Sequence, residues 1–178
     1  MDNFSHLLPT FNNKFDLEKY NGTTKDIMEA MDRVLPRAAK DVKKISSLFR
    51  GVNDIATAHK IHQFLRVYFI FKKDVGNQIL KYPRASIRLR YNDCKSYSIL
   101  AGSLLYDLHI PFTFKFAGYT SANKPTHVYI QSYFKYAPNG KRDPNGHRFI
   151  LDGCYHLFNV EKMPRFAKLG KLQTNNQL

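Results

Sequence analysis

The sequence predicts an α+β fold, in which N-terminal helices pack on an antiparallel sheet and a cysteine opens a central helix. Three observations lead to this prediction. Apolar residues recur at helical spacing in the first half of the chain, they alternate with period two in parts of the second half, and one long apolar helix lies between these regions. At 178 residues and 43% hydrophobic composition, the chain can bury one core without a second full domain.

The helical half begins after residues 1–22, a polar start that we expect to be loosely ordered. Thr23 or Thr24 caps a first helix, which Pro36 ends or kinks. A second amphipathic helix follows directly and closes at Gly51 in the manner of a C-cap.

A third helix is predicted to begin at Asn53 or Asp54 and to bury one apolar side. It runs into residues 67–71, whose aromatic content fits the end of a helix and a short strand equally well. Residues 78–90, with one proline and several basic side chains, are predicted to be a loop that forms one rim of a cleft.

The central helix is predicted to start at Cys94, because Asn92 and Asp93 are both good N-cap residues and apolar residues then recur every three or four positions through Leu108. The free N–H groups and positive dipole end of a first helical turn favour a thiolate. A cysteine in this place is well positioned to be reactive.

The sheet is predicted from alternating segments at residues 112–116, 126–133 and 149–152. Two Asn-Gly pairs within residues 138–147 favour a hairpin connection between the last two of these strands. Residues 155–160 are a further strand candidate.

The composition limits the kinds of binding partner but does not identify one. The net charge of +14, from 28 Lys and Arg against 14 acidic residues, would attract an anionic partner, but the basic residues form no single tract and no nucleic-acid-binding motif. No stretch approaches the ~18 apolar residues of a membrane span, and the N-terminus has no signal-peptide pattern, so we expect a cytoplasmic protein that does not contact membranes. Two cysteines are too few for a disulfide framework and are interpreted as free thiols.

Three residues stand out as a catalytic constellation: Cys94, His127 and Asp152. His127 opens one predicted strand, on the same face as Tyr129 and Gln131, and Asp152 ends the next. Strands joined by a hairpin are normally neighbours, so the imidazole and the carboxylate can meet beside the helix start. His127 would then take the Cys94 proton, and Asp152 would orient the ring.

The motifs that carry these residues resemble the transglutaminase-like superfamily: Asn92-Asp93-Cys94 before an apolar helix, His127 in a strand, and Asp152 at a strand end. The similarity spans about residues 64–158 and is that of a small prokaryotic or phage-type member. It implies a papain-like fold, a protein or peptide substrate, and thiol chemistry on amides through a thioester. The reaction would be hydrolysis of a peptide or isopeptide bond, or acyl transfer from glutamine to an amine.

On this basis the chain divides into three parts. Residues 1–60 are predicted to be a helical extension packed on the core, residues 61–165 a transglutaminase-like catalytic core, and residues 166–178 a flexible basic tail. No metal or cofactor is predicted, since the candidate ligands lack a recognised spacing.

The sequence also departs from the superfamily pattern. Lys95 follows the cysteine where an acidic residue is usual, and the chain has no Trp to help stabilise an oxyanion. The Cys94 backbone N–H is one candidate donor, and the side chain of Gln78 or Tyr82 is a second. Cys154 is interpreted as structural.

Two alternatives stay open, one for the catalytic base and one for the function of the protein. His147 and His156 flank Asp152 and are rivals of His127 as the base. The whole chain could also be a catalytically inactive module of the same fold, with a structural role or a role in binding a polyanion such as nucleic acid.

Overall fold

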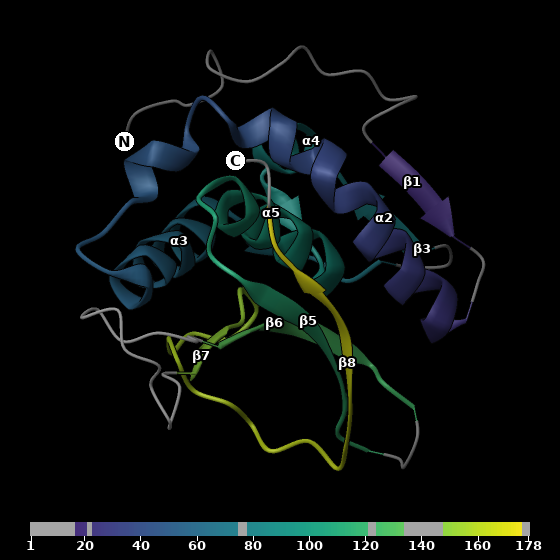
Figure 1. Ribbon diagram of the computed structural model, residues 1–178. Helices are drawn as coiled ribbons and strands as arrows, with labels where there is room; N and C mark the ends of the chain where they lie inside the picture. The colour runs from purple at the N-terminus through teal and green to yellow at the C-terminus, as the bar shows by residue number, and fades with distance from the viewer. Residues whose placement is uncertain (1–16, 21–22, 75–77, 121–123, 134–147, 176–178) are drawn as a thin grey trace.

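The computed structural model confirms an α+β fold (Figure 1) and describes residues 17–20, 23–74, 78–120, 124–133 and 148–175. The helices are α2 (Thr24–Val42), α3 (Asp54–Tyr68), α4 (Pro83–Leu89) and α5 (Cys94–Asp107), with the 3₁₀ helix η2 (Ser46–Phe49). The strands are β1 (Leu17–Tyr20), β2 (Ile70–Phe71), β3 (Gln78–Lys81), β4 (Tyr91–Asn92), β5 (Phe112–Gly118), β6 (His127–Tyr133), β7 (Arg148–Leu151) and β8 (Phe166–Gln173).

The main sheet is antiparallel, with strand order β7-β6-β5-β8. The helices cover one face of it, and the connection from β7 to β8 loops past the other face (Figure 1). The predicted strands at 112–116, 126–133 and 149–152 are therefore confirmed to within two residues. Alternation along β6 is confirmed as well, since Val128 and Ile130 enter the large core cluster while Tyr129 joins a small one on the opposite face.

Helix α5 lies at the centre of the fold, between α2 and the sheet (Figure 1). Its residues from Lys95 to Leu105 are all buried. A Cβ added at Gly102 would stand 2.9 Å from the ring of Phe112, so the absent side chain is what allows α5 to approach β5 this closely. The cysteine at the start of α5 is thus held by a helix that cannot shift without opening the core.

One difference from the sequence prediction lies in the N-terminal helices. Thr23 caps α2 through a reciprocal capping box with Asp26, as predicted, but the helix continues through Pro36 to Val42. Its buried stripe runs on without interruption past the proline, and we attribute the continuation to packing of that stripe on α5, which outweighs the ~3 kcal/mol cost of an internal proline. The predicted second helix is consequently the end of α2 followed by η2.

Residues 78–90 also differ from the predicted loop. They form β3, which pairs with β1, and then the short helix α4, in which Pro83 occupies the first turn where a missing N–H costs nothing. The ambiguous segment at residues 67–71 divides in two, since α3 ends at Tyr68 and β2 follows, paired in parallel with β4. Asn53 caps α3, as predicted.

The C-terminal prediction is wrong in two places. Residues 155–160 form turns rather than a strand, and residues 166–173 are strand β8 rather than a flexible tail. Strand β8 pairs with the edge of β5 that would otherwise be free, and the exposed Lys168 and Lys171 place charge on the new edge strand. The Asn-Gly connection at residues 138–147 lies outside the described residues.

A single large hydrophobic cluster joins α2, α3, α5 and the sheet. The first helices are therefore part of the main core, and the division of the chain at residue 60 stays a prediction. Within the described residues, no helix is long and apolar enough to cross a membrane.

Candidate active site

Cys94 is the first residue of α5, and its place is fixed by the N-cap. The Asp93 carboxylate accepts a hydrogen bond from the Ser96 backbone N–H at 3.0 Å, and Asp93 is almost fully buried. The sequence predicted this helix start, because the pattern that produces it is local.

His127 is the first residue of β6 and is tied to the same helix. The Ser98 hydroxyl, one turn after Cys94, donates to the Val128 carbonyl at 3.1 Å. This buried hydrogen bond fixes the start of β6 against the start of α5. The Cys94 and His127 side chains are consequently neighbours, and both line the same cavity.

Asp152 is the residue immediately after β7. The last pair between β6 and β7 is Ile130 with Leu151, so Asp152 lies one residue beyond it. In this register Asp152 lies on the same face as His127 and diagonal to it. The His127 Nε2–H donates to Asp152 Oδ2 at 2.6 Å, which leaves Nδ1 as the ring atom available to Cys94. The structure thus brings the three predicted residues together.

The surroundings of His127 raise the pKa of its imidazole. Burial opposes the positive charge on the ring, but the hydrogen bond and negative charge of Asp152, together with the nearby Cys94 sulfur, outweigh it and raise the His127 pKa to about 10. The imidazole is therefore protonated at neutral pH and held between a carboxylate and a sulfur.

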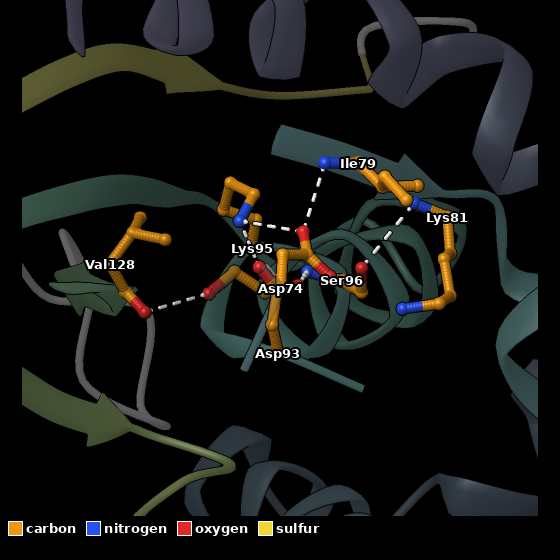
Figure 2. Close-up of polar contacts among 8 residues, drawn as sticks. Asp74, Ile79, Lys81, Asp93, Lys95, Ser96 and Val128 are labelled. Carbon is orange, nitrogen blue, oxygen red and sulfur yellow. Dashed lines mark hydrogen bonds and ion pairs between the residues drawn. The ribbon is translucent and has the colours of Figure 1, made fainter. Parts of the chain in front are cut away.

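A buried ion-pair network lies beside the cysteine, and the sequence prediction missed it. The Lys95 ammonium is paired with Asp93 and lies 3.2 Å from Asp74 Oδ2, although all three side chains are less than 10% exposed (Figure 2). Burial disfavours the Lys95 charge, but its two carboxylate partners and Cys94 keep its pKa above the usual value. The helix that carries the thiol thus starts beside a buried network of one ammonium and two carboxylates.

The same network anchors strand β3 to the helix start. Asp74 Oδ2 also accepts from the Ile79 N–H at 2.9 Å, and the Ser96 hydroxyl accepts from the Lys81 N–H at 3.4 Å (Figure 2). Gln78, the first residue of β3, is thereby held beside the site.

Helix α3 supports the turn that presents Asp152. Arg66 donates to the Gly153 carbonyl at 3.2 Å, and the buried His62 donates to the Tyr155 carbonyl at 2.9 Å. A Cβ at Gly153 would stand 2.9 Å from the ring of Tyr97, so this turn packs tightly on the core. The sequence prediction missed Arg66 and His62 as supports, since nothing in the spacing of a helical residue shows which distant carbonyl it reaches.

Two cavities meet at His127. The larger, about 550 Å³, is lined by Cys94, Gln78 and Phe71 as well as His127. The smaller, about 310 Å³, lies on the side of Asp152. The geometry therefore offers a substrate space next to the thiol and a second space behind the imidazole–carboxylate pair.

The remaining predicted residues fall as follows. Gln78 lines the cavity beside Cys94, whereas Tyr82 is buried in the core and does not line it. Cys154 is a free thiol in the turn after β7, and its backbone N–H donates to Asp152 Oδ1 at 2.9 Å. His156 is exposed, and His147 lies outside the described residues.

Fold and site together define an α+β protein in which a thiol, an imidazole and a carboxylate converge at the start of a buried helix. No protein-family model matches the chain, and no curated protein matches it either. Among solved structures, calcium-bound LapG of Legionella pneumophila is similar, with 18% identity and a TM-score of 0.40, over 78% of this chain and 69% of LapG. At this level of similarity the site is interpreted from its own geometry.

Proposed function

We propose that the protein is a transglutaminase-like thiol enzyme that acts on peptide, isopeptide or glutamine amide bonds, with Cys94, His127 and Asp152 as its triad. The observation that carries this proposal is the 2.6 Å hydrogen bond from His127 to Asp152, with Cys94 at a helix N-terminus in the same cavity as His127. This is the arrangement that nucleophilic catalysis by a thiol requires.

The reaction begins with attack of the Cys94 sulfur on the amide carbonyl carbon, while the carbonyl π electrons move to oxygen. Collapse of this intermediate expels the amine, which takes its proton from the His127 imidazolium, and a thioester remains. Water or an amine then attacks the thioester, giving its proton back to His127, and the thiolate leaves. Hydrolysis is the favoured outcome, because the sequence carries no recognisable second, amine-binding motif.

The oxyanion needs hydrogen-bond donors near Cys94. The Cys94 backbone N–H stands at the first position of α5, where a helix supplies no internal acceptor. The Gln78 amide lines the same cavity and is the proposed second donor.

Thiol reactivity tests the proposal with a control inside the same chain. At pH 6 we expect iodoacetamide to alkylate Cys94 much faster than Cys154, because His127 is charged beside Cys94, whereas burial raises the Cys154 pKa far above its usual value. Peptide mass mapping of timed samples gives both rates at once. Equal rates, or faster alkylation of Cys154, would overturn the triad.

The His127–Asp152 pair also predicts a pH dependence. The His127 pKa is raised in the folded protein, so the pair contributes stability that is full below about pH 6.5 and is lost as the pH rises toward about 10. Asp152→Asn is expected to lower the midpoint of the His127 ring titration, measured by NMR, and to flatten the fall in unfolding free energy between these limits. An unchanged midpoint would show that Asp152 does not stabilise the imidazolium.

The net charge of +14 favours a second candidate, a polyanion-binding module without catalysis. It predicts binding to nucleic acid that weakens steeply with salt and is the same in Cys94→Ala. Salt-dependent binding together with slow alkylation of Cys94 would favour this candidate over the enzyme.

A further inference from the structure

The side chains of His127, Asp152 and Cys154 form a cluster of potential metal ligands. A ring nitrogen of His127, a carboxylate oxygen of Asp152 and the Cys154 sulfur all lie within 4.8 Å of one another. Nitrogen, oxygen and sulfur donors in one cluster match Zn²⁺, which binds such atoms at about 2.0–2.3 Å in a tetrahedron. We infer that these three residues form an inhibitory zinc site.

The three ligands are held in place before any ion arrives. Asp152 is fixed by the Cys154 N–H at 2.9 Å, and the turn that carries both residues is held by Arg66 and His62 of α3. His127 is fixed from the other side by its strand. Because the ligands are already ordered, binding the ion costs little further conformational entropy.

An entry path and a fourth ligand position are present as well. All three side chains line the 310 Å³ cavity behind His127, and this cavity has room for a water molecule on the ion. Cys94 lines the other cavity, so the zinc site uses the second thiol of the chain, which the proposed reaction leaves unused. A sulfur ligand also selects against Ca²⁺ and Mg²⁺, which require oxygen donors.

Binding exchanges protons for the metal. His127 Nε2 is the ring nitrogen 2.6 Å from Asp152, so Zn²⁺ takes the place of the proton between these two groups. Zn–N, Zn–O and Zn–S bonds form as the Nε2–H hydrogen bond to Asp152 breaks, and the Nε2–H proton and the Cys154 thiol proton pass to solvent, without any change in oxidation state. With Nε2 on the metal, the neutral ring keeps its remaining proton on Nδ1, the atom that faces Cys94, and could release it only by becoming an imidazolate. Near neutral pH, His127 is then neither a base for the Cys94 thiol nor an acid for the leaving amine. This inhibitory consequence rests on the proposed function, whereas the metal site itself does not.

Direct binding to the full chain tests the site independently of activity. Chelator-stripped protein, kept reduced with a phosphine, is titrated with Zn²⁺ in a calorimeter. We expect one ion per chain for the wild type and for Cys94→Ser. For Cys154→Ser we expect zinc affinity at least ~100-fold weaker. Removing a residue that only hydrogen-bonds to a metal ligand weakens metal affinity 10- to 100-fold, and removing the ligand itself should weaken it more. Unchanged affinity in Cys154→Ser would overturn the site.

Cobalt identifies the thiol without any change at position 154. Co²⁺ bound to Cys94→Ser should show sulfur-to-metal charge-transfer absorption, because Cys154 is then the one thiol in the chain. Bound Co²⁺ without this band would contradict the inference.

The inhibition is measured separately, as Zn²⁺-dependent slowing of Cys94 alkylation that a chelator reverses. Zinc binding that leaves alkylation unchanged would overturn the inhibitory role and leave the site in place. A protein with an unreactive Cys94 that still binds zinc through Cys154 would overturn the proposed function alone.

Discussion

Replacing His127 with alanine is expected to slow thiol-dependent acyl transfer about 10²- to 10⁴-fold, which is the usual contribution of general acid–base catalysis. His127 is the group that shares its protons with both Cys94 and Asp152, and its charge at neutral pH depends on both. Without it, the thiol loses its proton acceptor and the amine loses its proton donor. Nitrophenyl acetate is a suitable first substrate, since it reports acylation of Cys94 before the natural substrate is known.

The matched control is His156→Ala, which removes an exposed imidazole from the turn that follows Asp152. We expect this variant to keep the wild-type rate. The double variant Cys94→Ala/His127→Ala should be no slower than Cys94→Ala, because residues that act as a unit are strongly non-additive. A rate loss in His156→Ala equal to that in His127→Ala, or additive losses in the double variant, would contradict the assigned roles.

Helix starts and strands were predictable because their causes are local. Thr23, Asn53 and Asp93 cap the helices that follow them, and each was among the residues named from sequence alone. The same is true of His127 at the start of β6, where the period-two pattern sets which side chains share a face. The pairing of His127 with Asp152 then followed from the rule that consecutive antiparallel strands are neighbours.

The differences arise where distant segments decide the local structure. Pro36 stays within α2, a helix that packs on α5, and β8 forms because β5 offers it an edge. Neither partner is visible in a short window of sequence. The burial of Lys95 is of the same kind, because the carboxylate of Asp74 reaches it from a separate segment. From sequence alone, a lysine in a basic chain gives no sign that it is buried.

Lys95 carries the largest expected effect on stability. In Lys95→Ala the carboxylates of Asp93 and Asp74 remain, 3% and 9% exposed, without the ammonium that compensates them. Removing one partner of a buried ion pair costs about 3–5 kcal/mol, because an uncompensated charge is left in the interior. Urea unfolding curves measure this loss as a lower midpoint with an unchanged slope.

The control is Lys25→Ala, which breaks an exposed pair between Lys25 and Glu29 at 3.7 Å. Pairs of this kind contribute about 0.3–0.5 kcal/mol, so the control should differ from wild type by no more than that. Equal effects of the two substitutions would show that Lys95 is not compensating buried charge.

A second substitution separates charge from packing. Lys95→Met keeps the length of the side chain, and Asp74→Asn removes one of the carboxylates that it leaves uncompensated. If buried charge is the cause, Lys95→Met/Asp74→Asn loses less stability than the sum of the two single variants. Asp93 is retained in all of these variants because it also caps the helix that begins at Cys94. A change in Cys94 alkylation among variants of equal stability would then measure the effect of the Lys95 charge on the thiol itself.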